Sequence, residues 1–225
     1  MKKEIQIKVP TDWSAITLKK YLELQRDIEV YGEEESGYVA TLLYHLCGVT
    51  PELILKLPSD VLGEIKVDLA GFMGETELPL KRFITIDGVE YGFEPNLSTM
   101  EYGAYLDITK YQNITIDENW SKIMSVLYRP VKSKLLTQYE IETYEGVNNH
   151  EKFLEVGMDV HFGALFFFLH TLMDLVRGIL NSSENMEKYP QSIKSDLVKN
   201  GEVIKQLFNS PQTISPSLML SSKNL

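Results

Sequence analysis

Apolar and polar positions alternate in two recurring patterns along this chain, and together they predict an α+β protein that is predominantly helical. A period of two, typical of a half-buried strand, occurs over 3–9, 83–93 and 138–144. Apolar residues spaced three and four apart indicate helices with one buried face. The predicted helices cover 17–26, 38–47, 59–73, 117–128, 148–155, 159–181 and 192–208, with further helices starting at Thr50 and Ser98.

Residues that cap or terminate helices set several of these boundaries. Thr17 is placed to cap the first helix, and Gly48 stands where a helix commonly ends in a left-handed conformation. Ser98 and Glu101 have the spacing of a capping box, in which each side chain accepts a hydrogen bond from a free backbone N–H. Pro130 is expected to end the helix over 117–128.

Asp87 and Gly88 separate two alternating runs, and this is the clearest local signal in the chain. Both residues of a two-residue type I′ turn need a positive φ angle, which Asp and Gly tolerate. The sequence therefore predicts a β-hairpin over 83–93.

The residue pattern of 5–49 recurs at 89–131 after a shift of 84 positions. The shift becomes 99 after a longer linker in the second copy. The matched pairs include Ile5/Val89, Ile7/Tyr91, Val9/Phe93, Tyr21/Tyr105, Leu22/Leu106, Leu57/Val156 and Asp60/Asp159. An internal duplication would give two related units, each a strand or hairpin followed by helices, at 1–76 and 77–189. Residues 190–225 would then form a C-terminal helix and an extended arm.

The composition is that of an ordinary globular protein, but its acidic charge argues against one class of partner, nucleic acids. The chain has 225 residues, of which 44% are hydrophobic, and its net charge is −10. Binding to a phosphate backbone requires clustered Lys and Arg, so direct nucleic-acid binding is not expected. With one cysteine, Cys47, the chain cannot form an internal disulfide.

The most apolar stretch, 160–180, is long enough to span a membrane. It nevertheless contains His161, His170, Asp174 and Arg177, and each ionisable group at bilayer depth costs a few kcal/mol. The stretch is therefore interpreted as a buried core helix, with Asp174 and Arg177 paired, and no membrane partner is expected.

No constellation of catalytic, cofactor-binding or metal-ligating residues emerges. His45 and Cys47 lie about 200° apart around a helix, and His161 and His170 lie half a turn out of phase, so neither pair shares a face. The glycine patterns of phosphate-binding and nucleotide-binding loops are missing from the sequence. The interpretation is a protein that is not an enzyme and has no cofactor or metal.

Two segments are candidates for contact with a partner. Phe166, Phe167 and Phe168 cannot all face one side of a helix, so either other elements surround that helix or some of the rings form an interface. The tail, 210–225, carries the apolar patch Leu218, Met219 and Leu220 and is too short to bury it alone. This tail is either disordered or docked on another surface.

Two segments also carry a resemblance to a known family. Gly48–Leu53 reads GVTPEL, and Pro58–Asp60 reads PSD; both resemble helix starts in small tail-assembly chaperones of tailed bacteriophages. The second copy, with ITIDGVEYGFEP and MDVHFGALFFF, is similar to morphogenesis proteins of phages, including crAss-like phages. The chaperones usually contain one such unit, whereas this chain contains two.

The resemblance implies a non-enzymatic phage morphogenesis protein that acts through protein–protein contacts, in the manner of a tail-assembly chaperone. The alternative is a structural virion component, such as a ring, connector or tail protein, whose C-terminal arm docks on a neighbouring subunit. Partners would be other morphogenesis or virion proteins, or further copies of the chain. The location would be the host bacterial cytoplasm during assembly, or the tail or connector region of the virion.

Overall fold

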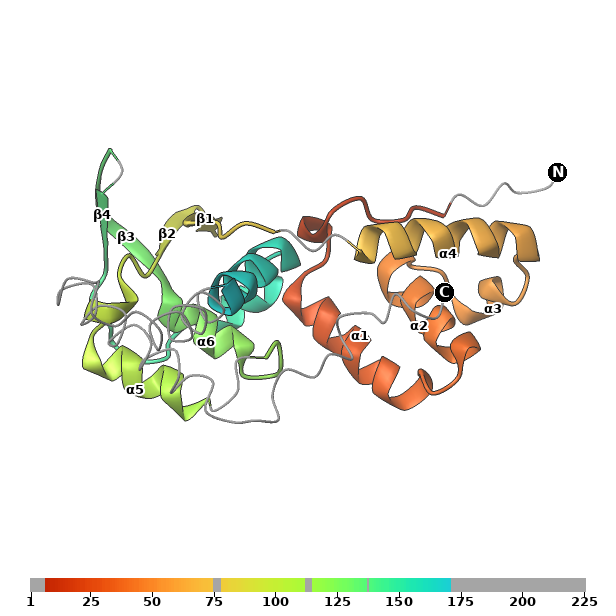
Figure 1. The fold of residues 1–225 in the computed structure, drawn as a ribbon, viewed down its shortest axis with the longest axis horizontal. Coiled ribbons are helices and arrows are strands. Elements are labelled where there is room, and N and C mark those ends of the chain that lie inside the picture. Colours follow the sequence, from red (N-terminus) through yellow and green to blue (C-terminus); the bar gives the residue numbers. More distant parts are fainter. Residues whose placement is uncertain (1–6, 75–77, 112–114, 137, 171–225) are drawn as a thin grey trace, which may run out of the picture.

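The computed structural model describes residues 7–74, 78–111, 115–136 and 138–170. In this part the protein has an α+β fold, mainly helical, with a four-stranded antiparallel sheet. Figure 1 shows the N-terminal helices at one end of the molecule and the sheet at the other. The predicted helix over 192–208, the pair Asp174–Arg177 and the C-terminal arm lie outside the described residues.

The N-terminal half, 7–74, is helical, and its helices begin and end close to the predicted positions. The Thr17 hydroxyl accepts a hydrogen bond from the backbone N–H of Lys20 at 3.4 Å, which confirms it as a cap. Gly48 adopts a φ of 68°, the left-handed conformation expected after a helix. The elements are η1 (Trp13–Ala15), α1 (Leu18–Tyr31), α2 (Glu35–Cys47), α3 (Pro51–Ile54) and α4 (Ser59–Met73).

The strand predicted over 3–9 is wrong for its described part. Residues 7–10 adopt no regular structure and pair with no strand. The alternation of Ile7 and Val9 instead reflects partial burial, because both side chains pack against the edge of the core. An alternating run without a neighbouring strand cannot satisfy its backbone groups as a sheet does.

The second half combines the sheet with helices. Its elements are β1 (Phe83–Ile86), β2 (Val89–Phe93), η2 (Leu97–Thr99), α5 (Tyr102–Lys110), α6 (Trp120–Leu127), β3 (Tyr128–Leu135), β4 (Gln138–Ile141) and η3 (His150–Glu155). A last helix covers 158–170. The strands follow the order β1-β2-β3-β4, and every neighbouring pair is antiparallel. The predicted hairpin is confirmed: Asp87 and Gly88 form its turn with φ angles of 50° and 79°.

The predicted capping box is wrong. Helix α5 begins at Tyr102, so Glu101 is itself the cap residue, and its side chain caps no helical N–H. Its carboxylate accepts hydrogen bonds from Arg129 and from the backbone N–H of Tyr144 instead. Strand β3 brings the charged donor Arg129 close to Glu101. The carboxylate therefore binds Arg129 and not the helix start that the local spacing predicts.

The predicted end of the helix before Pro130 is confirmed, and a strand, β3, follows it directly. Helix α6 ends at Leu127, and the chain continues directly into β3, in which Pro130 pairs with Tyr91 of β2. The carbonyl of Pro130 accepts a hydrogen bond from Glu142, so its side without an N–H faces β4. The pairing of β3 with β4 begins at Val131, so Pro130 lies just beyond its end, where a missing donor is tolerated.

The helix at 158–170 lies between the two halves and joins their cores (Figure 1). Met158, His161, Ala164 and Phe168 have no exposed surface, which confirms a buried core helix over the described part of the stretch. On the side facing the N-terminal half, the ring of Phe162 packs edge-on against Trp13 at a centroid distance of 4.9 Å. Side chains of the two predicted units therefore share one hydrophobic core.

The helices follow one another in a similar order in both halves, although the sheet occurs in one of them. In each half a short 3-10 turn precedes the first helix, and Leu18 and Tyr102, where α1 and α5 begin, are related by the predicted shift of 84. Helix α4 and the helix at 158–170 occupy matching final places. Strands β3 and β4 have no counterpart among the described elements of the first half. The duplication itself stays a prediction.

Candidate binding groove

A groove of about 820 Å³ lies beside the sheet in the second half. Its lining combines apolar side chains with polar ones, and it draws on both hairpins, the segment after β2 and the helix at 158–170. The lining residues are Leu80, Arg82, Phe93, Glu94, Pro95, Asn96, Leu97, Ser133, Leu135, Gln138, Tyr139, Glu140 and Phe167.

Aromatic rings hold the apolar part of the groove in place. The rings of Phe93 and Phe167 meet edge-to-face at 5.4 Å. The hydroxyl of Tyr139 donates a hydrogen bond to the carbonyl of Phe93 at 2.5 Å, and its ring packs on Phe83 at 4.6 Å. These contacts fix Tyr139 across the sheet, so the floor of the groove is already formed.

Gly92 is required for this arrangement. A Cβ atom at this position would lie 2.8 Å from the ring of Tyr139 and 3.0 Å from Ile141, closer than side-chain carbons approach one another. The missing side chain therefore allows Tyr139 of β4 to cross over β2. Larger residues at position 92 would displace the ring and change the shape of the floor.

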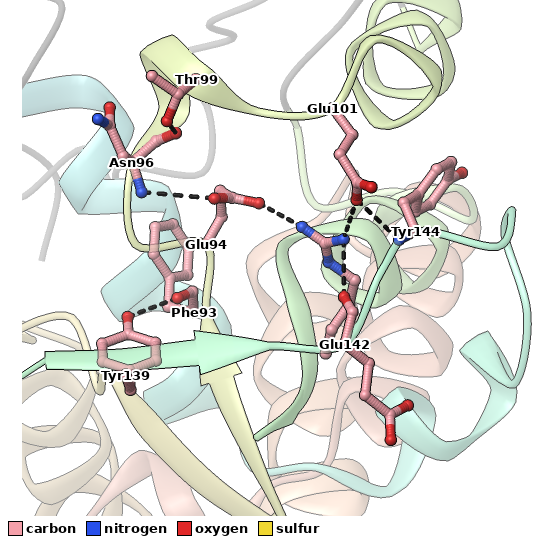
Figure 2. Close-up of polar contacts among 9 residues, drawn as sticks. Phe93, Glu94, Asn96, Thr99, Glu101, Tyr139, Glu142 and Tyr144 are labelled. Atoms are coloured by element: carbon pink, nitrogen blue, oxygen red, sulfur yellow. Dashed lines mark hydrogen bonds and ion pairs between the residues drawn. The ribbon is translucent and has the colours of Figure 1, made fainter. Parts of the chain in front are cut away.

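A buried ion-pair network holds Glu94, one of the polar residues that line the groove. Arg129 of β3 is 7% exposed, and one of its terminal nitrogens pairs with the carboxylate of Glu94, which is 8% exposed. The other donates to Glu101 at 2.7 Å and to the carbonyl of Glu142 at 2.9 Å. Figure 2 shows these contacts converging from the segment after β2, from the start of α5 and from the segment after β4.

The same network changes the pKa of Glu101, its more exposed carboxylate. Burial alone would raise the pKa of Glu101, but hydrogen bonds from the Tyr144 backbone N–H and from Arg129 outweigh it, and the pKa is lowered. Glu94 accepts a further hydrogen bond from the N–H of Asn96 at 3.4 Å. The negative charge of Glu94 is thus balanced by the positive charge of Arg129, which is also buried.

The two buried histidines, His45 and His161, serve packing and pairing. His161 has no exposed surface and bonds to Trp120 and to Phe153, while His45 pairs with Asp27 at 2.7 Å. Among the described residues, no three of the types His, Cys, Asp and Glu are grouped in a way that could hold a metal ion.

The three adjacent phenylalanines have three different environments. Phe167 lines the groove, and Phe166 is half-buried, with its ring stacked on Phe162 at 5.9 Å. Phe168 has no exposed surface and belongs to the core, so it offers nothing to a partner. The other predicted contact residues, Leu218, Met219 and Leu220, lie outside the described residues.

Sequence reasoning missed most of the groove, because it is assembled from segments that are far apart in the chain. One signal was available. Arg129 stands inside the apolar run 126–131, and a lone charge in such a run indicates a buried ion pair. Its partner Glu94 could not be identified without the pairing of β2 with β3.

Comparisons with known proteins add no family to this geometry. Neither protein-family models nor curated proteins nor solved structures match the chain. Within the residues described here, no helix combines the length and the apolar character needed to cross a membrane.

Proposed function

We propose that this chain is a non-enzymatic bacteriophage morphogenesis protein that acts through protein–protein contacts, in the manner of a tail-assembly chaperone. The observation that supports it best is the groove. Its floor is aromatic, with Phe93, Tyr139 and Phe167, and the charge of Glu94 in its wall is held by Arg129. Such a surface suits an apolar segment of another protein better than a substrate that must react.

The exposed rim of the groove supports the same role. Leu135 is 74% exposed and Leu136 is 91% exposed at the end of the β3–β4 hairpin, which projects from the body of the molecule (Figure 1). Two adjacent exposed leucines are unusual unless a partner covers them. The partner in this proposal is another morphogenesis or virion protein, met in the cytoplasm of the host bacterium.

A structural virion component is the second candidate. In that case the protein remains in the particle as a ring, connector or tail subunit, and its arm at 210–225 docks on a neighbouring subunit. The similar order of helices in the two halves favours this candidate, because related units within one chain often pack side by side in assemblies.

Deletion of the gene in the phage that encodes it, followed by complementation, tests the proposed function. We expect the deletion to reduce infectious particles, and wild-type protein to restore them. Leu135→Glu, which places a charge on the groove rim, should fail to restore them, whereas Val30→Glu, at another exposed position, on α1, should succeed. Normal particle yield without the gene would refute the proposal.

Mass spectrometry of purified virions separates the two candidates. A fixed number of copies per particle would establish the structural role and exclude an assembly factor that leaves. A chain that is essential for assembly but missing from the particle would establish the opposite.

A further inference from the structure

The groove has apolar surface exposed to water at the end of the β3–β4 hairpin. Leu135, which lines the groove, is 74% exposed, and its neighbour Leu136 is 91% exposed. Leu136 also has a φ of 55°, the left-handed conformation for which hairpin turns prefer glycine or asparagine. A bulky side chain at such a φ strains the backbone, and its exposure to water offsets none of that cost. A contact that covers the two leucines would account for their place in this turn.

The floor of the groove is apolar and already formed. Phe93, Tyr139 and Phe167 supply its rings. The Tyr139 hydroxyl donates to the carbonyl of Phe93 (Figure 2), and the Tyr139 ring packs on Phe83 at a centroid distance of 4.6 Å. Because these contacts hold the floor in place, a segment that binds here pays little for ordering the groove.

The charges that line the groove balance one another. Glu94 pairs with the buried Arg129, and the exposed Arg82 and Glu140 are of opposite sign. Neutral polar lining residues are Asn96, Ser133 and Gln138. The groove therefore favours an uncharged segment, because a charge that entered it would lose water without gaining a partner.

The C-terminal tail of the same chain has this character. Residues 206–222, which include most of the tail, contain no charged side chain, although 24% of the whole chain is charged. Leu218, Met219 and Leu220 form the apolar patch of the tail, and Pro216 just before it opposes helix formation. In an extended segment, side chains two residues apart point to the same side, so Leu218 and Leu220 can enter one groove together.

The connection between the groove and the tail favours a contact within one molecule. Phe167 lies in the last described helix, three residues before the described chain ends at residue 170. Leu218 follows 48 residues later. A flexible chain of that length spans about 40 Å on average, so its far end meets the groove at an effective concentration on the order of a millimolar. A second copy would have to be that concentrated to compete equally.

We propose that the tail of this chain binds the groove of the same molecule, with Leu218, Met219 and Leu220 packed on the aromatic floor and against Leu135. The inference deepens the proposed function and rests on it in one respect, because it takes the groove as the binding site for a partner. The tail competes with that partner, whose apparent affinity falls in proportion to the fraction of grooves left empty. The exposed leucines are thus covered until a partner displaces the tail.

Disulfide trapping in the full-length chain tests the contact. Cys47→Ser first removes the only cysteine, so that no other thiol interferes. Gln138→Cys then places a thiol in the groove lining, and Ser221→Cys places one directly after the apolar patch. We expect oxidation to join this pair within one molecule at least 10-fold faster than the control pair Val30→Cys and Ser221→Cys. Position 30 is equally reachable for a free tail, since it is exposed on α1, but it lies outside the groove lining.

Non-reducing gel electrophoresis and mass spectrometry separate the outcomes. Monomers that carry the disulfide between positions 138 and 221 would support the proposal. Disulfide-linked dimers would show that the tail binds a neighbouring copy and would overturn it. Equal rates at positions 138 and 30 would show that the tail has no preference for the groove, which overturns it as well.

A synthetic peptide of residues 210–225, added to the full-length chain, measures the competition. Leu218→Glu puts a charge in the patch and should release the groove, so fluorescence anisotropy should show the peptide binding this variant at least 10-fold more tightly than the wild type. Asn209→Glu adds the same charge outside the tail and should bind the peptide as the wild type does. Adding Leu135→Glu to Leu218→Glu should remove the binding. Equal peptide affinity for wild type and Leu218→Glu, or no binding by Leu218→Glu, would overturn the proposal.

Failure of this inference and failure of the proposed function give different results. Normal particle yield without the gene would refute the function but would leave the disulfide unchanged, because trapping uses the purified chain. Equal trapping rates, for a gene that particle assembly needs, would refute the tail contact alone.

Discussion

Acid should destabilise this protein through one fully buried histidine, His161. Its Nδ1 accepts a hydrogen bond from the indole N–H of Trp120 at 3.1 Å, and its Nε2 lies 3.1 Å from the carbonyl of Phe153, to which it donates. The bond from Trp120 requires the neutral ring, because a proton on Nδ1 would point at another donor. Burial lowers the pKa of His161 from 6.5 to about 4.

The sign and the size of the effect follow from this shift. Between pH 6.5 and about 4 the unfolded chain binds a proton at position 161 that the folded chain does not, so the free energy of unfolding falls as the pH falls. The loss attributable to this group is about 2 kcal/mol at pH 5 and about 3 kcal/mol at pH 4, relative to pH 7. Well below pH 4 both states bind the proton, and this contribution no longer changes.

His161→Gln isolates the contribution. Glutamine retains one donor and one acceptor but does not ionise. Urea unfolding at pH 7 and at pH 5 should show that the wild type loses about 2 kcal/mol more than His161→Gln between the two values. His170→Gln, an exposed position on the same helix, is the matched control and should behave as the wild type. Equal acid sensitivity in wild type and His161→Gln would refute the reasoning.

Two further variants examine the network and a helix end. Arg129→Met leaves the buried carboxylate of Glu94 without its cation and should lower the free energy of unfolding by roughly 3 to 5 kcal/mol in urea titrations, whereas a loss below about 1 kcal/mol would show that the pair is not buried in solution. Gly48→Ala places a side chain at a φ of 68°, and the new Cβ meets no other atom within 4 Å. Thermal unfolding should therefore show a free energy of unfolding about 1 kcal/mol lower, from backbone strain alone. An unchanged free energy of unfolding would contradict this.

The sequence predicted those elements that are encoded locally. The cap at Thr17, the glycine at position 48 and the turn at Asp87 and Gly88 each depend on neighbouring residues alone, and the structure has them as expected. The same holds for the fold class, since helical and strand periodicities can be recognised segment by segment.

The features that sequence analysis missed depend on distant parts of the chain. Local rules predict that Pro130 ends regular structure, yet it lies within strand β3, next to β2. Glu101 has the spacing of a capping residue, but Arg129 competes for its carboxylate from another strand. The groove was not predicted for the same reason, because its two walls come together only when the hairpins pair.

The bridge between Thr17 and Gly157 has a consequence for how the protein is made. It joins the start of α1 to residue 157, next to the last described helix. During translation, α1 is therefore synthesised well before the segment with which it pairs. Until then Trp13 and Tyr21 lack the ring of Phe162 that covers them. A topology with such distant contacts folds slowly, and the nascent N-terminal helices remain open to aggregation during translation.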